Sequence, residues 1–478
     1  MRLSSKVDRR KFLKYIGAGL VAAAGAGAGY YMYSKQPGYG PSQTVTIPKG
    51  WETASTYLAT STKENHSPVA SFKRRPYYLN PTDQQTIRFL SNCYDADDDP
   101  LQYNWYVDRQ PSSTERDYST KLPVGDHVVR LSVSDGTAED HVQQTFTVEP
   151  DQMYPPKQLH IKHKGMRMMV GWKGMRPIPI DITDEKLDII RDELGCNAVI
   201  IFGNTEFEDD LIEAGRLAIG KGFDRIYIAP LCLDLPIDET VENIGRFAKK
   251  VKVLREASDS VVYMIGHEFT FDAYGIVPGE THPDRLWYPI QNPDWVRNTY
   301  WKVLNSILPD AFRRIIALCR ENYGYQIAYA ATPDEAASIV PWSDPIFESV
   351  SSDAYIWDKA GWTEDWVVKH LSELKRFGKP VNSTEWGCLT YKGASQEWGF
   401  TEEDFAKYPY DEDEQANYIA QYCNMLNRAR IDAAFCAQLD DERLKGYGLY
   451  KATNPGCFGA GSSRKKGFYM YKSYQLST

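Results

Sequence analysis

From residue 160 onward, short apolar runs alternate with longer segments that have a helical pattern. This alternation is typical of βα units, whose strands lie parallel in one sheet. The runs that fit a strand are residues 166–172, 198–203, 225–233, 261–268, 326–331, 350–357, 380–386 and 433–439. Eight such repeats predict an α/β fold, a (β/α)8 TIM barrel. A doubly wound open sheet is the alternative, but the sequence lacks the Gly-rich phosphate turn that it would place after an early strand.

Two of the predicted strands lead to a glutamate that is followed by an aromatic residue. Glu268 closes the run 261–268 and precedes Phe269, and Glu385 precedes Trp386. Because all strands of a barrel end at one rim, both carboxyls should emerge where barrel enzymes hold their chemistry. Two facing carboxyls are also what cleavage of a glycosidic bond requires.

The surroundings of the two glutamates resemble the large clan of retaining glycoside hydrolases with (β/α)8 barrels. The matching motifs are Gly266-His-Glu268, after the fourth predicted strand, and Ser383-Thr-Glu-Trp-Gly387, after the seventh. The resemblance implies that Glu268 is the acid/base and Glu385 the nucleophile, and that the chain hydrolyses O-glycosidic bonds of a poly- or oligosaccharide without cofactor or metal. The sequence departs from the clan at His267, where an Asn that binds the sugar usually precedes the acid/base.

The two carboxyls must titrate differently, because one donates a proton while the other stays ionised. Glu268 has Gly266, Phe269 and Phe271 as near neighbours, and apolar surroundings raise a carboxyl pKa. Glu385 follows the polar stretch 382–384, which suits an ionised nucleophile. The local sequence therefore favours the same roles as the resemblance.

Further side chains near the strand ends are candidates for binding the substrate. They are His267, Tyr355, Trp357, Trp386, Trp172, Asn204 and Asp440. Asp353, Tyr355 and Trp357 share one face of the sixth predicted strand by alternation, and Tyr355 is positioned to hydrogen-bond the nucleophile. Packing within the barrel is the competing interpretation for each of them.

Two other functions fit the same barrel. A non-catalytic carbohydrate-binding or cell-surface protein on a degenerate barrel is favoured by His267 and by the lack of a Trp after the eighth strand. A metal-assisted hydrolase would use Asp353, Asp440 and Asp441. The net charge of −9 and the absence of a basic stripe exclude nucleic acid as an expected partner. The oligomeric state is left open.

Residues 67–149 form short alternating runs separated by turn-rich breaks, which predicts a β-sandwich ahead of the barrel domain, residues 150–478. Residues 94–105 and 125–136 resemble PKD and related immunoglobulin-like modules, and this implies a spacer or attachment role.

One turn of the predicted sandwich carries three alternating aspartates. Asp95, Asp97 and Asp99 have the spacing of a calcium loop, but the expected glycine is missing and Pro100 follows. We interpret this segment as a solvated turn.

The N-terminus resembles a twin-arginine export signal. Arg9-Arg10 precede Phe12-Leu-Lys14, and a weakly apolar Gly/Ala-rich run covers residues 15–33. The resemblance implies export to the outer face of the cytoplasmic membrane or beyond. For residues 1–33, the sequence allows either cleavage among the small residues between Ala24 and Ala28 or retention of the run as a membrane anchor. A linker rich in Ser, Thr, Pro and Gly follows at residues 34–66.

Overall fold

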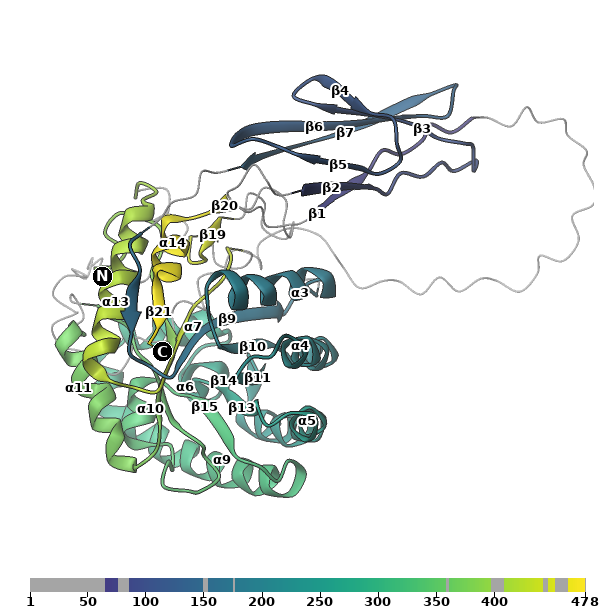
Figure 1. Ribbon diagram of the computed structural model, residues 1–478. Coiled ribbons are helices and arrows are strands. Elements are labelled where there is room, and N and C mark those ends of the chain that lie inside the picture. Colours follow the sequence, from purple (N-terminus) through teal and green to yellow (C-terminus); the bar gives the residue numbers. More distant parts are fainter. Residues whose placement is uncertain are drawn as a thin grey trace, which may run out of the picture. The chain divides into compact units, whose positions relative to one another are not determined.

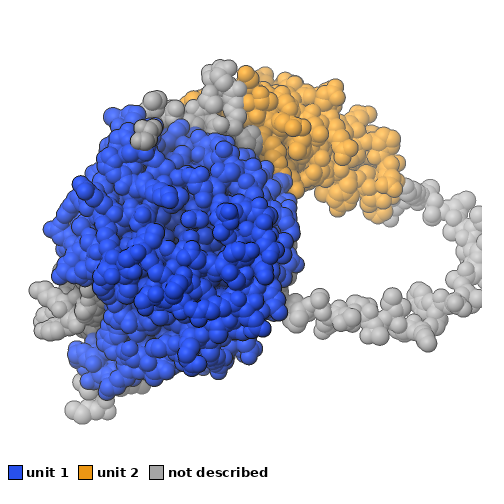
Figure 2. Space-filling model, turned by 60° about the horizontal axis from the view of Figure 1, so that its bottom comes forward, with its two compact units in different colours: residues 1–31, 151–478 blue, residues 32–150 orange. Residues whose placement is uncertain are grey.

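The computed structural model describes residues 65–75, 86–148, 154–174, 177–357, 361–396, 408–441, 446–451 and 463–477. The described residues divide into two compact units, one within residues 32–150 and one within residues 151–478 (Figure 2). The predicted export signal and residues 34–64 of the linker lie outside the described residues. Among the helices that are described, none has the length and apolar character needed to cross a membrane.

The smaller unit consists of two antiparallel sheets (Figure 1). One has the order β1-β2-β5 and the other β4-β3-β6-β7. Alternate side chains of both sheets point into a shared core, where Phe89 and Trp105 are almost fully buried. The strands are β1 (Phe72–Arg75), β2 (Thr86–Ser91), β3 (Gln102–Val107), β4 (Gln110–Ser113), β5 (Tyr118–Lys121), β6 (Gly125–Ser134) and β7 (Glu139–Val148).

The larger unit contains the predicted barrel. Eight strands form one parallel sheet in the order β15-β13-β11-β10-β9-β18-β17-β16. Between the two end strands, the Asp353 amide donates to the Ala331 carbonyl at 2.8 Å, so the barrel is nearly closed. The strands are β9 (His163–Gly171), β10 (Ala198–Asn204), β11 (Arg225–Leu231), β13 (Val261–His267), β15 (Ile327–Ala330), β16 (Val350–Asp353), β17 (Val381–Trp386) and β18 (Ala433–Cys436). The predicted (β/α)8 fold is confirmed.

Helices cover the outside of the barrel (Figure 1). Because both faces of each strand are buried, the strands read as nearly continuous apolar runs; all seven residues of β10 are buried. The longer helices are α3 (Ile180–Asp188), α4 (Glu208–Lys221), α5 (Ile237–Ala257), α7 (His282–Gln291), α9 (Trp301–Asn322), α11 (Glu364–Leu374), α13 (Glu412–Ala429) and α14 (Lys466–Ser473). The shorter ones include α6 (Phe269–Asp272) and α10 (Pro333–Ser338).

The first and last segments of the barrel unit are joined to each other. Strand β8 (Lys157–Leu159) pairs in parallel with β21 (Tyr474–Leu476). Beside this pair, the buried ammonium of Lys164 donates to the carbonyls of Tyr471 at 2.9 Å and of Tyr474 at 2.7 Å. A buried cation is tolerated where its donors are satisfied, so these bonds fix the C-terminal segment against β9.

The sixth strand is shorter than predicted. It ends at Asp353, so Tyr355 and Trp357 lie in the segment beyond it and not on a strand face. The register between β16 and β17 slips between Ser352 and Asp353, and the Ala354 amide then donates to the Glu385 carbonyl at 3.2 Å. The apolar sequence continues past the point where regular strand pairing stops. For this reason the predicted sixth strand was longer than the observed one.

A glycine in β9 gives the barrel interior room for an aromatic ring. A Cβ on Gly165 would lie 2.2 Å from Cδ1 of Phe435, which belongs to the interior core. We expect Gly165→Ala to lower the free energy of unfolding by about 1–3 kcal/mol, because the ring must leave its packed position. Urea unfolding measures the change. Gly220→Ala is the control: Gly220 is exposed on α4 with no atom within 4 Å of the added Cβ, and it should raise the stability by about 0.5–1 kcal/mol.

Candidate active site

The end of β13 turns sharply at the first predicted carboxyl. His267 is the last residue of the strand, Glu268 follows with a φ of 32°, and α6 begins at Phe269. A positive φ is uncommon for a residue with a side chain, and such strained positions concentrate at functional sites. Gly266 permits the turn, because a Cβ there would lie 2.4 Å from the Phe269 ring.

The carboxylate of Glu385, on β17, is held by two hydrogen bonds and an ion pair. The Tyr355 hydroxyl donates to Oε1 at 2.6 Å, and Nε2 of His267 lies 3.2 Å from Oε2. Arg167, on β9, forms an ion pair with the same Oε2. Charge-assisted hydrogen bonds of this kind stabilise an ionised carboxylate. Glu385 is therefore held in place as an anion.

Glu268 has the opposite environment. Its side chain is fully buried, and no group in the described part of the chain hydrogen-bonds to either carboxyl oxygen. Burial raises the pKa of Glu268 well above its usual range, and the charge of Asp353 raises it further, while the positive charge of His267 only partly offsets these effects. This environment favours the protonated form of Glu268, which is the form that can donate a proton.

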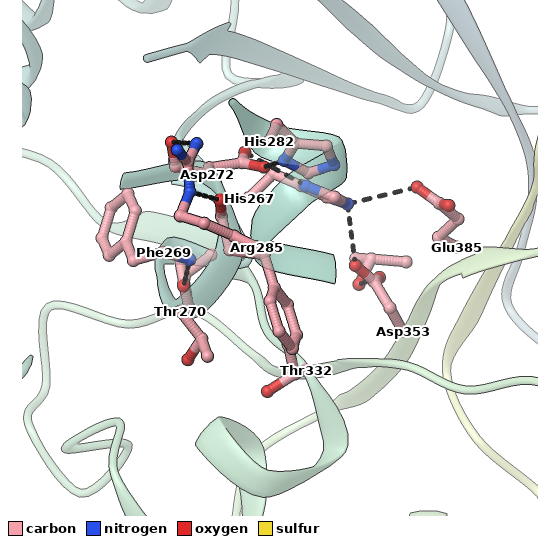
Figure 3. A network of polar contacts seen from close by, with 12 residues as sticks. His267, Phe269, Thr270, Asp272, His282, Arg285, Thr332, Asp353 and Glu385 are labelled. Atoms are coloured by element: carbon pink, nitrogen blue, oxygen red, sulfur yellow. Dashed lines mark hydrogen bonds and ion pairs between the residues drawn. The ribbon is translucent and has the colours of Figure 1, made fainter. Parts of the chain in front are cut away.

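His267 lies at the centre of a chain of charged side chains (Figure 3). Its Nδ1 lies 3.3 Å from Oδ2 of Asp272, and its Nε2 lies 3.2 Å from Oδ2 of Asp353. Burial alone would lower the pKa of His267, but the charges of Glu268 and Asp272 and the hydrogen bonds to Asp272 and Asp353 raise it to about 10. His267 is thus an imidazolium at neutral pH, with Glu385 and Asp353 on one side and Asp272 on the other.

Asp272 and its neighbours hold His267 in this orientation. Nδ1 of His282 lies 3.0 Å from Oδ1 of Asp272. Burial opposes ionisation, but His267 and His282 hold the pKa of Asp272 well below its usual range. Arg285 donates to the carbonyl of Asp272 at 3.0 Å and to Oδ1 of Asp234 at 2.7 Å. These contacts connect α6 and α7 to the segment that follows β11.

The structure brings together four of the predicted site residues, namely Glu268, Glu385, His267 and Tyr355, with Asp353 beside them. Trp386 lies elsewhere. It is fully buried and stacks on Tyr422 of α13, with ring centroids 4.2 Å apart. This position in the helix layer argues against the predicted contact between Trp386 and a sugar.

The remaining candidates make scaffold contacts. Trp172 belongs to the interior core of the barrel. Trp357 donates through Nε1 to the carbonyl of Gln396 at 2.9 Å. Oδ1 of Asn204 accepts the Lys173 amide at 2.8 Å, and Asp440 pairs with Nζ of Lys186 at 2.8 Å. Each of these contacts supports the packing interpretation.

Three further polar residues of the site are not among the predicted ones. The sequence signal for Arg167 is a cation inside the otherwise apolar run 166–172. Asp272 sits in the short α6. His282 opens α7 after a capping box at Thr281 and is 1% exposed.

A metal-assisted reaction finds little support in this geometry. His267, Glu268 and Asp353 each offer an atom, all within 4.8 Å of one another, but a metal there would have to displace the proton that Asp272 and Asp353 help His267 to hold. Asp440 and Asp441 pair with the buried ammonium groups of Lys186 and Lys465, each at 2.8 Å. Their charges are thus already compensated.

Comparison with known proteins gives only distant similarities in fold. No family model matches the chain. No curated protein matches it either. Similar solved structures include the β-glucuronidase of Parabacteroides merdae, with 10% identity, a TM-score of 0.44 and coverage of 87% of this chain and 54% of that one. A second is β-glucuronidase 2 of Bacteroides uniformis bound covalently to cyclophellitol-6-carboxylate aziridine, with 14% identity, a TM-score of 0.44, and 85% and 50% coverage.

A third is the GH2 β-galacturonidase of Eisenbergiella tayi bound to galacturonate, with 13% identity, a TM-score of 0.42, and 86% and 73% coverage. This chain spans about half the length of the two β-glucuronidases. The resemblance to these glycosidases concerns the fold.

Proposed function

We propose that the barrel unit hydrolyses O-glycosidic bonds of a poly- or oligosaccharide by a retaining mechanism. Glu385 is the nucleophile and Glu268 the acid/base. One observation carries the proposal: two carboxyls at the ends of β13 and β17 have opposite electrostatic environments. Glu385 is held as an anion by two hydrogen bonds and an ion pair, whereas burial raises the pKa of Glu268. A retaining glycosidase needs this division of roles.

In the first step, the Glu385 carboxylate attacks the anomeric carbon while Glu268 gives its proton to the leaving oxygen. A glycosyl ester forms on Glu385, and the negative charge there disappears. In the second step, Glu268 takes a proton from water, the water oxygen attacks the same carbon, and Glu385 leaves as a carboxylate. Arg167, His267 and Tyr355 stabilise Glu385 in its ionised form, before attack and after departure.

The burial of the site favours a second candidate, a carbohydrate-binding protein without catalysis. Glu268 is fully buried and Glu385 is 4% exposed. A sugar can reach them only if the side chains that cover them move aside. In a non-catalytic barrel the same charged network would serve stability alone.

We further propose that the protein acts outside the cytoplasmic membrane, after export by the twin-arginine route. The sequence of residues 9–14 supports this proposal. Changing Arg9-Arg10 to two lysines should leave the protein in the cytoplasmic fraction. Fractionation of cells that express both forms tests it, and unchanged export would contradict it.

A comparison of leaving groups tests the acid role. The assay uses the full chain and a panel of aryl β-glycosides and polysaccharides. We expect Glu268→Gln to slow cleavage of poor leaving groups, such as unsubstituted phenol, by roughly 10²–10⁴-fold, since these need protonation. Formation of the glycosyl ester from a dinitrophenyl glycoside should change far less.

The control is Glu373→Gln, an exposed position on α11, which should leave all rates unchanged. Equal losses for good and poor leaving groups would contradict the acid role. If the parent protein binds polysaccharide but cleaves no member of the panel, the binding protein becomes the better proposal.

A further inference from the structure

The loop between β2 and β3 of the smaller unit gathers three carboxylates. Asp95, Asp97 and Asp99 each offer a carboxylate oxygen, and these oxygens lie within 4.8 Å of one another. Like charges at such distances repel unless a cation lies between them. Nδ1 of His66 lies 3.2 Å from Asp97, at the outer side of this group, where His66 is exposed.

Asp95 is the residue that distinguishes this loop from a solvated acidic turn. It is 8% exposed, and its Oδ1 accepts the amides of Asp97 at 2.7 Å and of Asp99 at 3.3 Å. Its Oδ2 is buried, and no group of the described residues hydrogen-bonds to it. A buried carboxylate oxygen without a partner is unfavourable. The expected solvated turn is therefore wrong for Asp95.

We propose that Asp95, Asp97 and Asp99 bind a calcium ion. Calcium prefers oxygen ligands, takes six to eight of them in flexible geometry, and accepts backbone carbonyls and water beside carboxylates. The ion would give Oδ2 of Asp95 the partner that the protein does not supply, and it would neutralise the repulsion between the three charges. Three carboxylates in a surface loop correspond to the weaker, extracellular class of calcium sites, with a Kd of about 10⁻⁴–10⁻³ M.

The ion would also connect two parts of the smaller unit. The Val69 amide donates to the Tyr94 carbonyl at 2.8 Å, next to Asp95, and the His66 amide donates to Oδ2 of Asp97 at 2.7 Å. The segment before β1 thus rests on the same loop. Calcium should therefore raise the stability of the smaller unit, whatever the barrel unit does.

Calorimetric titration of the chelator-treated full chain with CaCl₂ tests the proposal. We expect binding of one ion at this site, and a rise of about 5 °C in the Tm of the smaller unit at 5 mM CaCl₂. Asp95→Asn should abolish both effects, although the asparagine keeps the oxygen that accepts the two amides. Asp99→Asn, at a half-buried position, should weaken binding at least tenfold and serves as the second variant if Asp95→Asn fails to fold.

The control is Asp126→Asn, which removes one exposed charge from the same unit and should bind calcium as the parent does. Absence of calcium binding up to 10 mM would overturn the proposal. So would binding that survives in both Asp95→Asn and Asp99→Asn, because the ion would then lie elsewhere.

Discussion

Glu385→Ala is expected to lower the rate of aryl glycoside hydrolysis by roughly 10⁴-fold or more, because it removes the group that forms the covalent intermediate. Arg167, His267 and Tyr355 remain in place around the vacated position and still polarise it. Steady-state rates with a dinitrophenyl glycoside measure the loss. Circular dichroism of the variant shows whether the fold is intact.

Azide provides the decisive control for this variant. The small anion can occupy the space left by the carboxylate and attack the anomeric carbon from the same side. The product should be a glycosyl azide of inverted configuration, identified by NMR, with a rate that rises with azide concentration. Glu373→Ala should behave as the parent. Full activity of Glu385→Ala without azide would exclude Glu385 as the nucleophile.

His267→Ala is expected to lower the free energy of unfolding by about 3–5 kcal/mol, since it leaves buried carboxylates without their cation. Asp272 loses the partner at 3.3 Å, and Asp353 and Glu385 lose the one at 3.2 Å. Urea unfolding of the barrel unit at pH 6 measures the change. A change below 1 kcal/mol would show that the imidazolium does not hold these charges.

The pH dependence of stability separates the charge of His267 from its packing. Its pKa is about 10 in the folded protein and 6.5 as a reference. Since the folded protein binds this proton more tightly, the stabilisation is fully present below pH 6.5 and is lost as the pH rises toward 10. His267→Asn should lack this alkaline loss, whereas the parent should show it.

A second buried histidine in the barrel unit provides the matched control. Burial lowers the pKa of His370 to about 4. The contribution of neutral His370 to the free energy of unfolding is therefore fully present above pH 6.5 and is lost as the pH falls toward 4. His370→Asn should therefore keep the alkaline loss of the parent and change only the acidic side. An identical alkaline profile in His267→Asn and the parent would contradict the raised pKa of His267.

The barrel could be predicted from the sequence because each strand is buried on both faces. Such strands appear as short apolar runs, and β10 is an example in which no residue is exposed. The ends of strands are harder to predict, because hydrogen bonding can stop while the apolar pattern goes on. The segment after Asp353 shows this: Ala354 and Ile356 are buried but lie outside the strand.

The site could be predicted only where its residues sit at strand ends. Glu268 and Glu385 were found in this way, whereas Arg167 meets Glu385 across β18, which lies between β9 and β17 in the sheet. No local pattern reports a contact between residues so distant in the sequence. Trp386 could have been excluded by alternation, because adjacent residues of a strand point to opposite faces. With Glu385 facing the interior, Trp386 had to face the helices.

The pairing of β8 with β21 gives the barrel unit the connectivity of a ring. Its first and last segments are held together by a strand pair and by the bonds of Lys164. A single cut in an exposed loop of the barrel unit would therefore leave two fragments, and the pairing of β8 with β21 would still hold them together. The barrel unit should then tolerate a nick better than a barrel whose terminal segments lie apart.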